Sequence, residues 1–253
     1  MTTPVEPVGQ DGSELVAFDP GAAIRLLTEG ELEIVGRLVE ASNATLYCRV
    51  RLGGKQAACV YKPVAGERPL WDFPDGTLAG REVAAYAVSE AGGWGTVPPT
   101  VLRDGPFGPG MCQLWIDVDE SVDVVAMLRG SDRRLRPIAL FDAVVNNADR
   151  KGGHLLPTET GRIFAVDHGV CFAAMDKLRT LLWNWAGEPL AGEEYALLRR
   201  LRSDLDNGLG VALEDLLTPE EIKATAARVD RLLANGTLPV PTDDWPAVPW
   251  PPF

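Results

Sequence analysis

The sequence has no uninterrupted apolar segment of about 18 residues, the length at which a transmembrane helix is expected. Its beginning has no cationic stretch followed by an apolar one, which argues against a signal peptide. Basic residues are also scarce, because 24 lysines and arginines stand against 36 aspartates and glutamates, for a net charge of −12. This imbalance argues against nucleic acid as a main partner and against stable association with anionic membranes.

Cysteine is scarce as well, and no two cysteines have the CxxC spacing of a redox or zinc site. All four stand in apolar surroundings, at Cys48, Cys59, Cys112 and Cys171. We interpret them as small buried hydrophobic residues in a reducing compartment, and we expect a cytoplasmic location. The apolar fraction of 46% is typical of a globular protein, and the 253 residues suit one large domain or two lobes around a cleft.

The first half of the chain is rich in β-branched and aromatic residues that alternate with polar ones. This pattern predicts five strands of an antiparallel sheet, over 31–40, 44–52, 56–63, 99–105 and 110–119. Residues 78–93 have the composition of a helix that ends at Gly92 and Gly93. Small or apolar residues predict that positions 79, 83, 86 and 87 form its buried face.

The second half is mostly helical. Helical patterns cover 121–130, 134–147, 193–208 and 218–236, and a pair of short strands over 153–157 and 162–169 interrupts them. A β-rich half followed by a helical half predicts a two-lobed α+β fold, with an antiparallel-sheet N-lobe and a mostly helical C-lobe.

We divide the chain into four parts: a lead-in (1–29), an N-lobe (30–118), a helical C-lobe (119–237) and a tail (238–253). The tail contains many prolines and tryptophans, so it is expected to be extended. Its Trp245, Trp250 and Phe253 are expected to pack on the body of the protein.

The segment FDAVVNNADRKGGHLL, residues 141–156, concentrates polar chemistry between apolar neighbours. Two amides, a carboxylate, two cations and an imidazole lie within 146–154, more than an ordinary loop requires. Three other charged residues lie on or next to predicted elements. Lys62 ends the third strand, Glu82 lies on the helix, and Asp167 follows the strand before it. Together with Asp149 of the polar loop, they are the kinds of group that phosphoryl transfer from ATP requires.

The segments VYKP, REVAAY, NNADRKGGH and AVDHG resemble the atypical branch of the protein-kinase-like fold. That branch includes the phosphatidylinositol 3/4-kinases and the HipA-type serine kinases. The resemblance covers roughly residues 30–235. Within this branch, the sequence looks most like a small actinobacterial family of phosphatidylinositol-kinase-like proteins, the SCO1664 family. It implies a kinase that uses ATP with Mg²⁺ or Mn²⁺ and transfers the γ-phosphate to a hydroxyl group.

The resemblance also implies roles for single residues. Lys62 would bind the α/β-phosphates and form an ion pair with Glu82, for which Glu90 is the nearest alternative. The turn made of Ser42, Asn43, Ala44 and Thr45 stands where a glycine-rich loop covers the phosphates, although it lacks a glycine run. It would supply backbone N–H groups and a hydroxyl.

Asp149 would be the catalytic carboxylate that faces the acceptor hydroxyl, with Asn147 bracing the loop and Arg150 pairing with a carboxylate. Asp167 would bind the metal ion. His154 stands where the relatives usually carry an asparagine that binds Mg²⁺, for which imidazole is the poorer ligand. Three alternatives remain open: a single metal ion, a metal held by His154 through nitrogen or water, or a preference for Mn²⁺. We expect His168 to be structural.

These patterns predict a phosphotransferase whose acceptor is a soluble inositol or polyol-type small molecule, or a serine or threonine of a protein. The alternative is a nucleotide-binding pseudokinase that acts as a scaffold or regulator. His154 and the missing glycine run favour the pseudokinase, whereas Lys62, Asp149 and Asp167 favour the enzyme.

Overall fold

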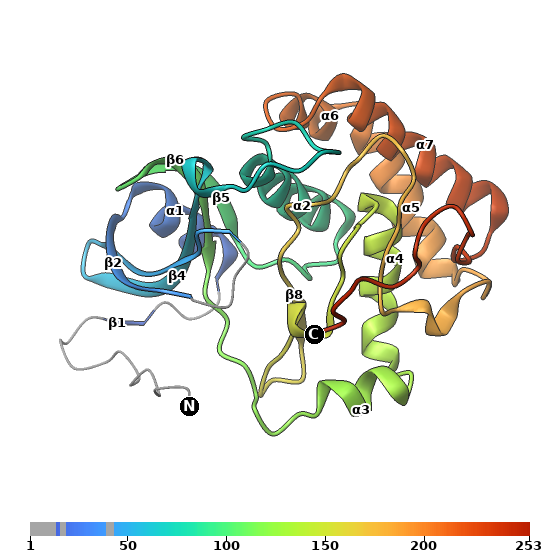
Figure 1. Ribbon diagram of the computed structural model, residues 1–253, viewed down its shortest axis with the longest axis horizontal. Helices are drawn as coiled ribbons and strands as arrows, with labels where there is room; N and C mark the ends of the chain where they lie inside the picture. The colour runs from blue at the N-terminus through green and yellow to red at the C-terminus, as the bar shows by residue number, and fades with distance from the viewer. Residues whose placement is uncertain (1–13, 16–18, 39–42) are drawn as a thin grey trace.

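The computed structural model describes residues 14–15, 19–38 and 43–253. A strongly curved sheet forms one side of the molecule and a group of helices forms the other (Figure 1). The predicted two-lobed α+β fold is therefore confirmed.

The sheet has the strand order β2-β3-β4-β6-β5, and all neighbours along this path are antiparallel, as predicted. Its strands are β2 (Glu31–Arg37), β3 (Leu46–Leu52), β4 (Lys55–Pro63), β5 (Thr100–Gly105) and β6 (Gly108–Leu114). A short additional strand, β1 (Glu14–Leu15), pairs in parallel with β4. Strand β4 lies between β3 and β6, and Lys62 near its end pairs with Met111 of β6.

Helix α1 (Pro20–Glu29) lies within the residues expected to be a lead-in. The side chain of Asp19 caps it by accepting a hydrogen bond from the N–H of Gly21, and Pro20 occupies the first turn. Ala23, Leu26 and Leu27 are buried, and the two leucines pack in the apolar core of the sheet. This helix was not predicted, and it belongs with the N-lobe.

Helix α2 (Leu78–Gly92) ends as predicted, with Gly93 in the left-handed conformation at φ 79°. Its predicted buried face is largely wrong, because of positions 79, 83, 86 and 87 only Ala79 is buried. The buried positions include Ala84, Ala85 and Val88, which pack into the core of the helical lobe. Since α2 packs into that core, its orientation is fixed relative to the C-lobe.

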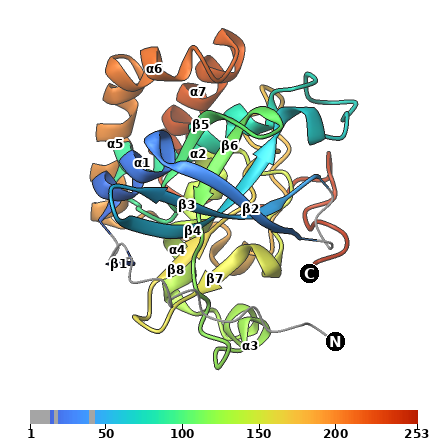
Figure 2. The same ribbon diagram turned by 90° about the vertical axis from the view of Figure 1, so that its left-hand side faces the viewer.

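The helical lobe contains α3 (Val124–Arg129), α4 (Arg136–Val145), α5 (Gly192–Leu205), α6 (Gly208–Leu213) and α7 (Pro219–Asn235). Figure 2 shows α6 and α7 above the sheet, α5 beside it, and α3 at the opposite end of the lobe. The predicted strand pair forms an antiparallel sheet of β7 (Leu155–Pro157) and β8 (Ile163–Ala165). Short 3₁₀ turns complete the chain: η1 (Val64–Gly66), η2 (Arg133–Leu135), η3 (Gly152–His154) and η4 (Trp183–Trp185).

All four cysteines are buried and carry free thiols, as predicted. Residues 238–253, all of which the structure describes, form no helix or strand. Trp245 packs on Trp71 with ring centroids 6.3 Å apart, and the ring of Phe253 lies against Gly152. The prediction for Trp250 is wrong, since 84% of this residue is exposed. Within the described part of the chain, no helix has the length and apolarity needed to cross a bilayer.

Candidate active site

The polar loop begins where α4 ends. Asn146 adopts the left-handed conformation at φ 55°, which asparagine tolerates better than most residues, and so turns the chain out of the helix. Its side-chain amide donates to the carbonyls of Ala173 and Met175, and its Oδ1 accepts from the N–H of Lys177. Asn146 therefore ties the polar loop to the segment that follows Asp167.

Arg150 and Asp142 form an ion pair that is fully buried, with both side chains 0% exposed. The Arg150 guanidinium donates to both carboxylate oxygens of Asp142, at 2.9 to 3.2 Å, and Nη1 donates to the carbonyl of Val166. A buried pair of this kind is tolerated because its hydrogen bonds are satisfied. It fixes the polar loop to α4 and to the residues just before Asp167.

Asn147 holds the backbone of the loop from inside. Its Nδ2 donates to Asp142 Oδ1 at 3.0 Å, and its Oδ1 accepts from the N–H of Asp149 at 2.9 Å. The Asn147 carbonyl accepts from the N–H of Arg179. These bonds hold the backbone of Asp149 in one position.

Lys62 lies between two carboxylates. Its Nζ is 2.6 Å from Glu82 Oε1 and 2.9 Å from Asp167 Oδ1. Burial alone would lower the pKa of Lys62, but Asp167 and Glu82 outweigh burial and raise it. The pKa of Asp167 is lowered, chiefly by the Lys62 ammonium. Burial raises the pKa of Glu82, and the Lys62 ammonium opposes that rise. Lys62 and Asp167 are therefore charged at neutral pH, and α2, β4 and the segment after β8 meet at this point.

Asp167 is in the left-handed conformation, at φ 62°. A residue other than glycine adopts this conformation at some cost, so its surroundings must hold it there. Part of that support comes from the next residue, because the N–H of His168 donates to Glu82 Oε2 at 2.9 Å. Glu82 thus orients Lys62 with one oxygen and the Asp167 backbone with the other.

His168 connects this group to the buried Arg150 pair. Its Nε2 is 2.7 Å from Arg150 Nη2, and since arginine can only donate, Nε2 accepts and the ring proton lies on Nδ1. Within the described residues, Nδ1 has no hydrogen-bond partner. Burial lowers the pKa of His168, and the positive charge of Arg150 lowers it further, so this ring is neutral at pH 7.

Asp149 is more accessible, with 32% of its side chain exposed. Partial burial raises its pKa, and Lys151, whose Nζ is 3.3 Å from Asp149 Oδ2, opposes that rise. A partly exposed carboxylate with a raised pKa is well suited to accept a proton from a substrate.

His154 faces Asp167, with Nε2 3.3 Å from Oδ2. The backbone N–H of Lys151 donates to His154 Nδ1 at 3.4 Å, which places the ring proton on Nε2. Burial lowers the pKa of His154 to about 4, so the ring beside Asp167 is neutral at pH 7. To bind a metal ion through Nε2, the ring must give up this proton.

The turn expected to cover the phosphates is only partly described, because Ser42 lies outside the described residues. The N–H of Ala44 donates to the carbonyl of Gly66, and Asn43 Oδ1 accepts from the N–H of Arg68. The Thr45 hydroxyl is buried and donates to the Asn43 carbonyl. In this arrangement these groups bond to protein rather than facing an open site.

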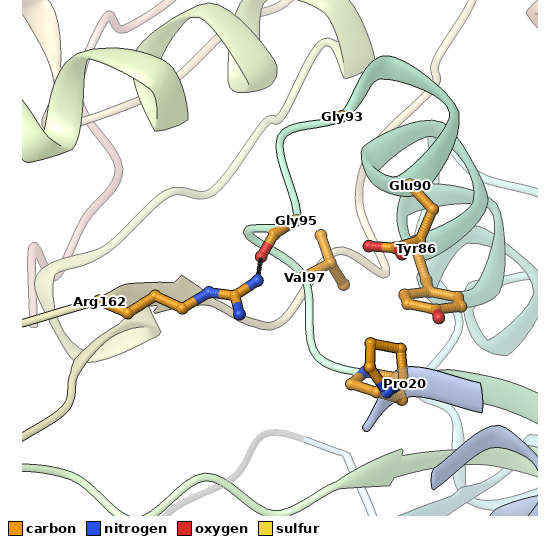
Figure 3. A pocket seen from close by; sticks show the side chains of 8 residues that line it. Pro20, Tyr86, Glu90, Gly93, Gly95, Val97 and Arg162 are labelled. Atoms are coloured by element: carbon orange, nitrogen blue, oxygen red, sulfur yellow. Dashed lines mark hydrogen bonds between the residues drawn. The ribbon is translucent and has the colours of Figure 1, made fainter. Parts of the chain in front are cut away.

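Glu90, the alternative to Glu82, lies elsewhere. It lines a separate cavity of about 220 Å³ together with Tyr86, Pro20 and Arg162 (Figure 3). Arg162 donates to the Gly95 carbonyl at its edge. None of the charged residues around Lys62 lines this cavity, so Glu82 is the carboxylate of α2 that pairs with Lys62.

Comparison with known proteins places the chain in a family. No family model matches the chain. Protein Rv2133c of Mycobacterium tuberculosis is 42% identical to it over 263 aligned positions, which cover 90% of this chain and 94% of that protein. The chain belongs to the Rv2133c family. The name of that relative carries no statement of activity.

Two more distant relatives have names that state an activity. Phosphatidylinositol 4-kinase gamma 4 of Oryza sativa is 26% identical over 81% of this chain, and its Arabidopsis thaliana counterpart is 30% identical over 50%. The chain spans 44% and 27% of these two plant proteins, so it covers less than half of each. The resemblance to phosphatidylinositol kinases therefore holds, while membership of the HipA-type or SCO1664 groups stays a prediction.

Solved structures share the fold. Hydra Fam20 with sugar has a TM-score of 0.59 over 84% of this chain and 86% of its own. The Golgi casein kinase with Mn/ADP bound has a TM-score of 0.56 over 85% and 75%. Both are 14% identical to this chain, a level that shows the fold alone. The Rv2133c-family chain therefore has a kinase-like fold.

The residues present suit a metal ion that arrives with a nucleotide. Among the described residues, no group of three or more histidine, cysteine or acidic side chains forms a ready metal site. Asp167 Oδ2 and His154 Nε2 face each other, and His154 offers a second ligand once the proton on Nε2 has moved away. Mg²⁺ typically takes one or two protein ligands and completes its coordination with phosphate oxygens and water.

Two ion-pair partners of the site residues were not predicted from the sequence. Asp142 was not identified as the partner of Arg150, although a lone carboxylate in a helix of mostly buried residues is a signal that could have revealed it. Lys151 was counted as a loop cation, but its ion pair with Asp149 was not foreseen.

Proposed function

We propose that this protein is an ATP-dependent phosphotransferase that moves the γ-phosphate to a hydroxyl group. The observation that carries the proposal is the position of Lys62, held between Glu82 and Asp167 by ion pairs of 2.6 and 2.9 Å. This arrangement joins the sheet, α2 and the segment after β8, and it presents a cation and a carboxylate to the same space. Phosphoryl transfer requires such a pair of groups beside the triphosphate.

Each charged residue has a separate task in the proposal. Lys62 binds the α/β-phosphates, while Glu82 keeps its ammonium in place. Asp167 and His154 hold Mg²⁺ or Mn²⁺, which when bound supplies positive charge beside the phosphate oxygens. Asp149 accepts the proton of the acceptor hydroxyl, which its raised pKa favours. Arg150 and Asn147 hold the loop that carries Asp149.

The relatives support nucleotide and metal use. The Golgi casein kinase, which shares the fold, carries Mn and ADP in its solved structure. The plant relatives are phosphatidylinositol kinases by name, which supports an inositol or another polyol as acceptor, with a serine or threonine of a protein as the other candidate. Four buried free thiols support a reducing, cytoplasmic location.

A pseudokinase is the second candidate, and one observation favours it. The neutral His154 ring carries its proton on Nε2, 3.3 Å from Asp167 Oδ2, so in the arrangement seen here this nitrogen has no free lone pair for a metal ion. A protein that bound nucleotide in this state, without a metal ion, would serve as a scaffold or regulator.

Two measurements distinguish the candidates. The melting temperature is recorded with ATP and Mg²⁺, with ATP and Mn²⁺, and with ATP and a chelator. Transfer from ATP labelled on the γ-phosphate is then followed with a metabolite extract. The enzyme requires metal-dependent stabilisation and labelled product that disappears in Asp149→Asn. Stabilisation by ATP in chelator, with no labelled product under any condition, establishes the pseudokinase instead.

A further inference from the structure

The C-terminal segment 244–253, here called the strap, crosses the face of the protein that carries the polar loop. It extends across the helical lobe (Figure 1), and its last residue, Phe253, lies against Gly152. Trp245 stacks on Trp71, which lies in the connection between β4 and α2. The Ala247 carbonyl accepts from the N–H of Thr180 at 3.0 Å and from Trp183 Nε1 at 2.8 Å. The strap therefore contacts the connection from the N-lobe and the segment after Asp167.

The C-terminal end of the strap contacts the polar loop directly. The N–H of Gly152 donates to the carbonyl of Pro252 at 2.9 Å. A Cβ atom at Gly152 would overlap the ring of Phe253, so only glycine leaves room for this ring. Gly152 lies between Asp149 and His154 in the loop, and its buried surface is covered by the strap.

The bonds made by the strap are those that a bound polypeptide would need. An extended peptide gains most of its affinity by pairing its backbone with exposed N–H and C=O groups. The N–H groups of Gly152 and Thr180 already donate to strap carbonyls. The strap thus occupies backbone donors, at Gly152 of the polar loop and at Thr180, that an extended peptide could otherwise use. Asp149 nevertheless keeps 32% of its side chain exposed, so a smaller molecule can reach it.

We infer that the strap excludes extended polypeptides from the acceptor side, and that the acceptor is a small polyhydroxyl compound. This inference rests on the proposed phosphotransfer. In the reaction, the acceptor oxygen bonds to the γ-phosphorus as the bond from that phosphorus to the β–γ bridging oxygen breaks. ADP leaves with the bridging oxygen, and the hydroxyl proton passes to Asp149.

The test uses the full chain, ATP labelled on the γ-phosphate, and Mg²⁺ or Mn²⁺. Dephosphorylated casein serves as the extended polypeptide, and myo-inositol, glycerol and the small-molecule filtrate of a cell extract serve as small acceptors. We expect label in the small-molecule fraction and none in casein. Label in casein from the full chain would overturn the inference. If label moves to neither fraction nor to water while ATP and metal still bind, the proposed function fails, and the inference fails with it.

A variant and its control test the strap directly. Trp245→Ala combined with Phe253→Ala removes both ring contacts, whereas Trp250→Ala removes a ring that is 84% exposed. We expect the double variant to exchange the Gly152 amide hydrogen several-fold faster and to label casein, while Trp250→Ala matches the parent. If exchange accelerates in the double variant but casein remains unlabelled, the strap is not what excludes polypeptides, and the inference is overturned.

Discussion

Lys62 Nζ and Glu82 Oε1 lie 2.6 Å apart, although they belong to different elements and only 2% of the Glu82 side chain is exposed. A buried carboxylate requires a partner, because removing one member of such a pair leaves an uncompensated charge. The Glu82 position is itself fixed by its neighbour Arg81, which donates to Glu221 of α7 at 2.6 Å. The orientation of Lys62 thus depends on how α2 is anchored in the helical lobe.

Lys62→Met is expected to weaken ATP binding by at least about tenfold, since the lost phosphate contact is a charge-assisted hydrogen bond. Lys55→Met is the matched control, because Lys55 lies on the same strand with an exposed side chain. Isothermal calorimetry with ATP and Mg²⁺ measures the ATP affinity of both variants. Equal affinities for Lys62→Met and the parent would remove Lys62 from the nucleotide site.

The variants Asp149→Asn and Asp167→Asn are expected to lose different functions. Asp167→Asn should lose metal-dependent ATP binding, because the carboxylate that would hold the metal ion is neutralised. Asp149→Asn should bind ATP and metal nearly as well as the parent and lose turnover, because its charge acts on the acceptor oxygen. Calorimetry paired with a turnover assay separates the two effects. The division of roles is wrong if both variants lose nucleotide affinity equally.

His154 determines how metal is held. If its Nε2 is a ligand, His154→Ala should raise the Mg²⁺ or Mn²⁺ concentration needed for half-maximal turnover, and His154→Asn should restore use of Mg²⁺, since an amide oxygen suits this hard cation. If His154 only lies beside Asp167 and binds no metal ion, both variants should leave the metal requirement unchanged. Titration of turnover with each metal at saturating ATP decides between them.

The buried Arg150–Asp142 pair is expected to contribute strongly to stability. Arg150→Met leaves Asp142 charged and 0% exposed, and breaking such a pair costs about 3–5 kcal/mol. The control is Arg25→Met, whose side chain is 72% exposed in its pair with Glu29, and exposed pairs contribute about 0–1 kcal/mol. Urea unfolding of both variants measures the free energies. Similar losses in the two variants would contradict the argument.

Elements with strong local signals could be predicted from the sequence. Alternation identified β2, β3 and β4, and the Thr218–Glu221 capping box with Gly236 delimited α7. The candidate site could be predicted in part, because Lys62, Glu82, Asp149 and Asp167 follow one another in a characteristic order and the structure brings Lys62, Glu82 and Asp167 into contact.

The rest depends on partners far apart in the chain. Arg81 and Glu82 are buried on α2 because each has an ion-pair partner in another element, so hydrophobic periodicity misplaced the buried face of that helix. Likewise, nothing in the local sequence indicates that the ring of Phe253 packs against Gly152. Such contacts are set by tertiary packing, which sequence periodicity does not record.

The pH dependence of turnover tests whether Asp149 is the base. Burial raises its pKa above the ordinary value of 3.8, while Lys151 lowers it. A base acts when deprotonated, so turnover should fall as the pH drops through the pKa of Asp149, at a higher pH than for an unperturbed aspartate. Lys151→Met removes the opposing charge and should move this acidic limb to still higher pH. Lys223→Met, which changes an exposed lysine of α7, should leave it in place. The profile of kcat/KM against pH, with circular dichroism to confirm folding at each pH, measures the limb. A limb that moves to lower pH in Lys151→Met, or does not move, would exclude Asp149 as the titrating base.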